Sequence, residues 1–520
     1  MDSTSKYWGN NYHFVTHIGA PTTDPKARKL AKQDVMQHIR RNRKNPHVLR
    51  RYGPLQCDLD IPQTFNQSHV CPSEQLDLDT DQTYLASVDG LDVASDPNSS
   101  TLPRSLSVTH GNLNETPLRG LSISRLGAGR SDPFVKFPIE LNSRSRELVE
   151  LIFDERSGRA SPLTVAWFQI GMLDAASFHQ LLSGAATYFN NLRHGDGGQA
   201  NGESLAHHAY SLQLINSQMR KPGTATTDGV ISSVVGFACY YHLIGDMKSW
   251  RKHLVGLKEI VQMRGGIGSL HSNKYLRIML SCIDISGSCT MDETPNFPFP
   301  IHLVPSTLPS LPFTSLGSFY PSHIDILALN FTNNFGLIDI LQDLSLESLH
   351  LQREIQQTRG NVLKDSMYIC DYTNPILHRL LSHPRQENPS ATAVMAEMIR
   401  LAAILYLIAI RQSFGIYPTR VASQVHKLTV LLMTYEGSGV ENRMWEDHGL
   451  RLIELWVITV GGILSDEKDK AVLFAKRLHA AMRRVSVATY GDLEDILREF
   501  SWVDEIHGTL LRDFRSNLIN

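Results

Sequence analysis

The segment from residue 26 to residue 51 contains ten Lys or Arg residues, and Asp34 is its one acidic residue. Side chains of this charge and density can displace counterions from nucleic acid phosphates, and such binding does not depend on base sequence. The same composition is typical of a nuclear import signal, whose centre would be the run from Arg40 to Lys44. A solvated charged tail is the third interpretation. The ten residues are Lys26, Arg28, Lys29, Lys32, Arg40, Arg41, Arg43, Lys44, Arg50 and Arg51.

A second segment mixes acidic and hydrophobic residues. Residues 52–103 contain no Lys or Arg but nine Asp or Glu, and such a segment cannot bury enough apolar surface to offset the entropy of ordering it. Interleaved carboxylates keep apolar side chains solvated until a partner groove takes them, a pattern typical of transcription activation segments. A solvated linker is the alternative interpretation. The apolar residues concerned are Leu76, Leu78, Tyr84, Leu85 and Leu91.

Motifs for metal binding and catalysis are sparse. The sequence has no CxxC, P-loop, HExxH, nucleophile elbow or GxGxxG fingerprint. His207 and His208 are adjacent, so on a helix they point about 100° apart and cannot hold one metal ion; we expect surface or cap positions for them. We therefore expect no metal, no cofactor and no enzymatic activity. A pocket for a small molecule between packed helices stays an open alternative. Six scattered cysteines fit a reducing compartment: Cys57, Cys71, Cys239, Cys282, Cys289 and Cys370.

Two further pairs are expected to be structural. Cys282 and Cys289 are seven residues apart, so they share a face if their helix extends that far, and we expect them in the core. Glu397 and Arg400 are three residues apart and can form a local ion pair.

The apolar run 401–410 is about half as long as a bilayer requires, so it is predicted to be a buried helix rather than a membrane span.

The elements that would position these residues are helices. From about residue 131 apolar residues recur at helical spacing, and strand-like alternation is scarce. We predict a large, irregular all-α domain over 131–520, a basic arm over 1–53 that is helical from about Pro25, and a disordered linker over 54–130. A Pro-rich stretch, 294–323, divides the domain in two. The predicted helices span 161–192, 203–220, 229–245, 249–264, 274–286, 324–357, 393–412, 421–435, 449–465, 468–486 and 502–514.

The best-defined of these is the helix after Gly245-Asp246. Trp250, Leu254, Leu257 and Val261 fall on one face. The helix should end at Arg264-Gly265-Gly266, because a glycine can adopt the left-handed cap and a cation suits the last turn. An amphipathic helix with a glycine stop explains this stretch fully.

The same stretch resembles the central segment of the fungal-specific transcription factor domain. Members of that family typically show a Gly-Asp, a His-x-x-Gly-Leu helix and an Arg-Gly-Gly stop, which correspond here to Gly245-Asp246, His253 to Leu257, and Arg264-Gly265-Gly266. Further similar pieces follow in the family's order. They are 126–140, Leu173-Asp174-Ala175, Asp228 to Ile231, Ile283-Asp284, Pro295 to Pro298, Ile399 to Ala402, Leu455-Trp456-Val457 and Gly461-Gly462, with Phe14-Val15 and the basic arm resembling the start of a subgroup.

The resemblance implies a nuclear regulator of transcription whose helical domain serves regulation, protein contact and dimerisation. The family's DNA-reading module uses six cysteines in two CxxC-containing clusters; because no CxxC is present, we expect the subgroup that lacks this zinc cluster, with DNA contact limited to the basic arm. The implied partners are DNA, bound non-specifically or through another protein, the transcription machinery or co-regulators, and a second copy or related chain, but no membrane. A co-regulator that never touches DNA, and a small-molecule-binding or enzymatic helical domain, are the alternatives.

Overall fold

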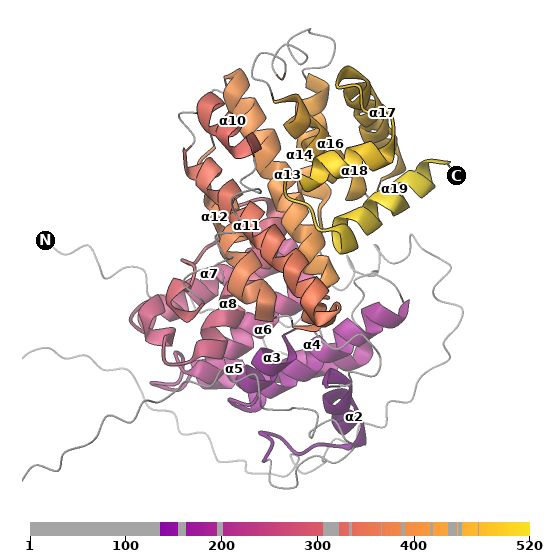
Figure 1. Ribbon diagram of the computed structural model, residues 1–520. Coiled ribbons are helices and arrows are strands. Elements are labelled where there is room, and N and C mark those ends of the chain that lie inside the picture. Colours follow the sequence, from indigo (N-terminus) through magenta and orange to yellow (C-terminus); the bar gives the residue numbers. More distant parts are fainter. Residues whose placement is uncertain are drawn as a thin grey trace, which may run out of the picture. The chain divides into compact units, whose positions relative to one another are not determined.

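The structure is a computed structural model that describes residues 136–153, 163–194, 201–304, 322–331, 335–365, 367–385, 390–416, 420–434, 445, 450–465 and 467–519. The basic arm and the acidic segment 52–103 lie outside the described residues. Within them every regular element is a helix (Figure 1). The predicted all-α class is therefore confirmed.

The first group of helices packs around α6 (Asp228–Ile244), which is buried along most of its length. Its Val, Ile and Phe side chains are buried because α3, α4, α5, α7 and α8 all contact it. The other elements of this group are α2 (Ser143–Ile152), α3 (Thr164–Gly171), α4 (Ala175–His194), α5 (Gly202–Met219), α7 (Met247–Met263), η3 (Ile267–Leu270), α8 (Lys274–Met291) and η4 (Ile301–Leu303).

The second group packs around α13 (Ala391–Ser413). By length and composition α13 could cross a membrane, but 94% of its most apolar window is buried within the protein. The buried helix predicted for 401–410 is confirmed. The other elements are α10 (Ser322–Asn330), α11 (Phe335–Thr358), η5 (Asn361–Lys364), the π-helix η6 (Ile369–Thr373), α12 (Asn374–Ser382), α14 (Ala422–Thr434), α16 (Arg451–Ile463), α17 (Lys468–Arg484), α18 (Tyr490–Arg498), the π-helix η7 (Asp504–Gly508) and α19 (Thr509–Ile519).

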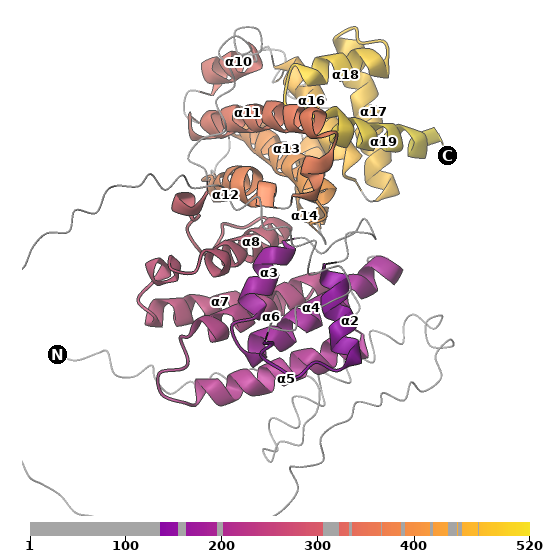
Figure 2. The ribbon, with the colours of Figure 1, turned by 60° about the horizontal axis from the view of Figure 1, so that its bottom comes forward.

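The helix α8 belongs to the cores of both groups. Its first turns, from Leu276 to Ile283, pack with α6 and α7, whereas Ile285 and Cys289 pack in the core that surrounds α13. Both α12 and α14 contact α8, and Figure 2 shows these three helices side by side. The helix extends to Met291, and Cys282 and Cys289 are both buried, which confirms their predicted core position.

The turn from α6 into α7 explains the Gly245-Asp246 pair, because each of the two residues caps one of these helices. Gly245 caps α6 with φ of +80°, a left-handed conformation that glycine adopts without strain. Asp246 then caps α7, since its carboxylate accepts the Ser249 N–H at 3.0 Å. At the other end Gly265 has φ of +108°, and the Gly266 N–H donates to the Val261 carbonyl as in a Schellman motif. The predicted apolar stripe and glycine stop of α7 are confirmed.

Several predicted boundaries were wrong. The helix predicted for 161–192 is broken between Gly171 and Ala175, where Asp174 and Ser177 exchange side-chain and backbone hydrogen bonds that start α4. The helix predicted for 324–357 is two helices, α10 and α11. In 502–514 the α-helical part begins only at Thr509, after the π-helix η7. The short helices α2, α12 and α18 were missed, because two or three turns carry too few apolar repeats to reveal a period.

Candidate ligand cavity and buried ion cluster

Residues that carry the family resemblance contact one another. Asp228, at the start of α6, pairs with Arg264 at the end of α7 and accepts a hydrogen bond from Asn273 Nδ2 at 2.8 Å. Asp284 on α8 accepts from the Asn296 side chain and the Phe297 N–H, both at 2.8 Å. These carboxylates anchor turns, so the motifs specify the fold rather than supply chemistry.

The glycines of these motifs allow close packing. A methyl group on Gly229 would overlap the carboxylate of Asp174, and one on Gly461 would overlap the Phe474 ring. The Trp456 indole, in the same motif as Gly461, donates to the Ser501 carbonyl at 3.0 Å. These motif positions therefore let helices approach at the distances that the domain requires.

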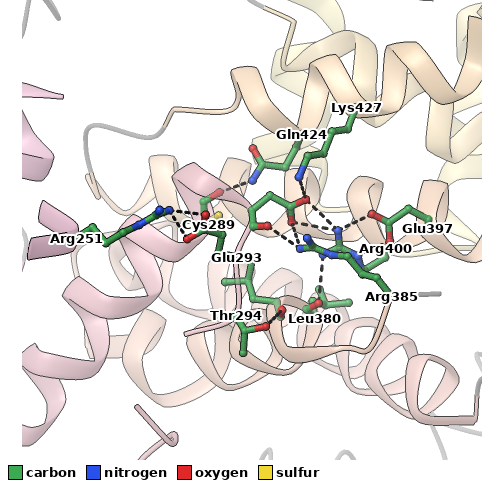
Figure 3. Close-up of polar contacts among 12 residues, drawn as sticks. Arg251, Cys289, Glu293, Thr294, Leu380, Arg385, Glu397, Arg400, Gln424 and Lys427 are labelled. Atoms are coloured by element: carbon green, nitrogen blue, oxygen red, sulfur yellow. Dashed lines mark hydrogen bonds and ion pairs between the residues drawn. The ribbon is translucent and has the colours of Figure 1, made fainter. Parts of the chain in front are cut away.

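A buried ion cluster forms where α8 ends. Asp292 caps α8 with φ of +52°, and its side chain is fully buried. Arg400 Nη2 lies 3.1 Å from its Oδ1, Lys427 Nζ lies 2.6 Å from its Oδ2, and Arg385 Nη2 lies 3.0 Å from Oδ1. Figure 3 shows these three cations converging from α13, α14 and the chain after α12, with Glu397 beside Arg400.

The opposite charges of this cluster stabilise one another electrostatically. Burial alone would raise the pKa of Asp292, but Arg400, Lys427 and Arg385 together outweigh it and hold the pKa below its usual value. Arg400 also pairs with Glu397 at 2.7 Å, which confirms the predicted local pair. Because the carboxylate belongs to α8 and the cations to the second group, the cluster fixes the two groups of helices to each other. Such a paired network has the composition of a structural ion cluster.

A partly open cavity of about 100 Å³ lies between the two groups of helices. It is lined by residues of α2, α3, α4, α6 and α8 from the first group and of η6, α12 and α13 from the second. Most of the lining is apolar: Ile152, Leu163, Trp167, Leu181, Gly184, Ala185, Tyr188, Gly236, Leu243, Met279, Ile283, Ile369 and Ile416. The polar lining comprises Gln180, Cys239, His242, Cys282, Ser286, Asn374 and Arg411.

Arg411 is the charged residue of this lining. Its side chain is buried, with 3% of the residue exposed. One terminal nitrogen donates to Asn374 Oδ1, and the other donates to Ser286 Oγ at 2.6 Å. Among the described residues no carboxylate lies within ion-pair distance of Arg411. Its guanidinium is thus hydrogen-bonded but not charge-balanced.

Two titratable neighbours of Arg411 in the lining, His242 and Cys239, carry no compensating charge. Burial, and then Arg420 and Arg411, lower the pKa of His242 to about 3, so this imidazole is neutral at ordinary pH. Burial raises the pKa of Cys239 to about 12, so this thiol stays protonated. Cys282 lies 3.2 Å, sulfur to sulfur, from Cys370 of η6, and both are free cysteines. The hydrogen bond with Cys370 and the nearby charge of Arg411 lower the pKa of the Cys282 thiol, against the opposing effect of burial. The cavity is therefore an apolar space with one fixed positive charge.

Some of the residues singled out in the sequence lie within the described part of the chain, and others lie outside it. The ten cationic residues of the arm and the apolar residues of the acidic segment lie outside the described residues, so their roles stay predictions. His208 was predicted at the surface or at a cap, and this was wrong: it is 5% exposed and stacks on Tyr240. Its Nδ1 lies 3.1 Å from Gln180 Oε1, whereas His207 contacts His179. The cause is that both α4 and α6 pack against α5 and cover His208.

Sequence reasoning missed the two residues that organise this region, Asp292 and Arg411. The available signal was the placement of Arg400 and Arg411 at the two ends of a fully apolar run. Charges so placed in a core helix require internal partners. The partner of Arg400, Asp292, lies 108 residues away in the sequence, and no local pattern connects them.

Comparison with known proteins gives one match. The family model described as the fungal specific transcription factor domain matches residues 148–503, from the middle of α2 to the residue before η7. No curated protein and no solved structure shows a significant match to the chain. The match covers more than half of the chain and confirms the resemblance found in the sequence. The chain belongs to the fungal specific transcription factor domain family.

Proposed function

We propose that the protein is a nuclear transcription regulator in which residues 1–53 deliver the chain to the nucleus and to nucleic acid, while the helical domain, residues 131–520, receives control. The family match over residues 148–503 carries this proposal, because membership supports a role in transcription regulation. The charge segregation adds to it, since ten cations precede a segment of 52 residues without Lys or Arg.

The import role is tested by substitution within the arm. Replacing Arg40, Arg41, Arg43 and Lys44 with Ala in a fluorescent fusion should move the protein out of the nucleus, because import signals depend on a compact basic run. A matched control replaces Lys26, Arg28, Lys29 and Lys32 with Ala, which removes the same charge elsewhere in the arm. Nuclear accumulation that is unchanged in the first variant would remove the import role.

Phosphate binding by the arm has a separate signature. If six or more of its cations contact phosphates, the affinity of the full chain for duplex DNA should fall about a thousandfold or more between about 50 and about 200 mM salt. Fluorescence anisotropy with two DNA duplexes of unrelated sequence measures this slope. Equal affinities for the two duplexes are expected, whereas the absence of binding at the lowest salt would exclude phosphate contact.

A co-regulator that acts by protein contact alone is the second candidate function. The acidic segment 52–103 favours it, because its apolar side chains are interspersed with carboxylates. Tethered to an unrelated DNA-binding domain, this segment should raise reporter transcription, and replacing Leu76, Leu78 and Leu85 with Ala should abolish the effect. Replacing Thr80, Thr83 and Ser87 with Ala is the matched control. A tethered segment without activity would leave it as a linker.

A further inference from the structure

We propose that the cavity beside Arg411 binds a small monocarboxylic acid with an apolar body, whose carboxylate pairs with the Arg411 guanidinium. This inference concerns binding by the helical domain and does not depend on what the basic arm does. It starts from a comparison within one helix. Arg400 and Arg411 both lie on α13 and both are buried, but only Arg400 has carboxylate partners among the described residues.

A buried cation without a counter-charge is costly, because it has lost its hydration and gained no ion pair. The two partners of Arg411, Asn374 Oδ1 and Ser286 Oγ, are neutral oxygens. They hold the guanidinium in place at the wall of the cavity without balancing its charge. A carboxylate in the cavity would supply that balance, since a guanidinium binds carboxylates through parallel N–H groups.

Asn374 offers a second donor to the same ligand. Among the described residues its Nδ2 donates to Cys282 Sγ alone, at 3.5 Å, and sulfur is a weak acceptor. A carboxylate oxygen beside Arg411 would be a stronger acceptor for this amide. Cationic and neutral donors therefore converge on one end of the cavity, as in sites that fix the orientation of a small ligand.

The rest of the lining determines the polarity and the size of the ligand that the cavity can hold. Trp167, Leu181, Met279 and Ile283 are among the apolar residues that line it. Its volume of about 100 Å³ is of the same order as an engineered cavity of about 150 Å³ that holds benzene. A short branched chain therefore fits, and a single aromatic ring is the upper limit of size. Arg411 is the one cation of the described lining, so a second negative charge on the ligand would lie unpaired among apolar groups.

Because the cavity lies between the two groups of helices, a bound acid would affect how the two groups are arranged. Its lining joins α4, α6 and α8 of the first group to α12 and α13 of the second. A bound acid would thus contact both groups at once and favour the arrangement in which they enclose it.

The test uses the full chain with benzoate and isovalerate as probes, and benzamide and isovaleramide as uncharged controls of matched shape. We expect at least one acid to bind with a Kd of about 1 mM or tighter by calorimetry. The same acid should raise the Tm by a few degrees when present in large excess over its Kd. Each amide should bind at least about tenfold more weakly than its acid.

Gly184 provides a variant that blocks the cavity without disturbing its walls. It lines the cavity within α4, and nothing lies within 4 Å of the position where its Cβ would stand. Gly184→Leu should therefore fold and lose acid binding. Gly256→Leu is the matched control, since Gly256 lies within α7, is open in the same way and is outside the lining. It should bind the acids as the natural protein does.

Arg411→Gln tests the charge itself, with circular dichroism to check that the variant folds. It should bind the acid and its amide equally. The proposal is overturned if neither acid gives heat or a Tm shift at about ten times the expected Kd. It is also overturned if Gly184→Leu retains binding, or if the amides bind the natural protein as tightly as the acids.

Discussion

Arg400 and Arg411 show, at the scale of single residues, how a charge is kept inside this helical core. Arg400 has two carboxylates, Glu397 from its own helix and Asp292 from the end of α8. Within the part of the chain that the structure describes, Arg411 donates to neutral oxygens, those of Asn374 and Ser286. The Glu397 pair was predictable, because the two residues are three apart on one helix. The Asp292 contact depends on the tertiary fold and was not predictable.

Replacing Asp292 with Asn should destabilise the protein by about 3–5 kcal/mol, because Arg400 would lose its buried counter-charge from α8. Chemical denaturation at neutral pH measures the free energy of unfolding. Asp343→Asn is the matched control: Asp343 pairs with Arg379 at the surface, with both side chains more than 40% exposed, and such pairs contribute less than about 1 kcal/mol. A similar small effect for both variants would contradict a structural role of the ion cluster.

Glu347 on α11 predicts a pH dependence. Burial raises its pKa to about 7, from a model-compound value of 4.5, against the opposing hydrogen bond from Thr373. Since the folded state then binds the proton more tightly than the unfolded state, the stabilising effect is present below about pH 4.5 and is lost as the pH rises through about 7. The protein should therefore lose about 3 kcal/mol of stability relative to Glu347→Gln between about pH 5 and about pH 8.

Urea denaturation of the natural protein and of Glu347→Gln at both pH values checks this, since the difference between them cancels every other titrating group. The gap should widen toward high pH. A gap that does not change with pH would show that Glu347 titrates normally.

At the scale of elements, long helices with a clear apolar period were predicted well and short ones were not. The segments that became α6, α7, α14 and α17 were placed within two residues of their observed ends. Boundaries failed where a side-chain cap rather than a change of period starts a new helix, as at Asp174. Which helices contact each other depends on residues far apart in the sequence, as in the close approach of Gly287 on α8 to Trp250 on α7.

The close approach of Gly287 to Trp250 predicts that the same Gly→Ala substitution changes stability in opposite directions at Gly287 and at Gly256. Gly287→Ala should destabilise the protein by about 1–3 kcal/mol, because its methyl group would overlap the Trp250 ring, which is fully buried and cannot move aside. Gly256→Ala adds the same methyl group to α7 where the space is open, and should stabilise the protein by about 0.5–1 kcal/mol. Thermal unfolding of both variants measures the two shifts. Equal shifts would show that the two helices do not interlock at Gly287.

At the scale of the whole molecule, the all-α class and the family were predictable because collinear motifs and helical periodicity both extend along the chain. The motif residues proved to be caps, anchors of turns and sites of close packing, so they indicate the fold without indicating a site. The cavity could not be predicted, since its lining comes from elements spread between α2 and the residue Ile416 after α13. The account therefore joins two parts: a helical body that belongs to a family of transcription regulators, and a basic arm proposed to bring it to chromatin.

The most direct test of this account is genome-wide occupancy of the tagged full chain, compared with a chain that lacks residues 24–51. A chain that lacks residues 103–130 is the control of equal length. The account predicts that the full chain and the control are nuclear and associated with chromatin, and that removal of residues 24–51 abolishes both properties. A full chain distributed through the cytosol, with no enrichment at any genomic site, would contradict it.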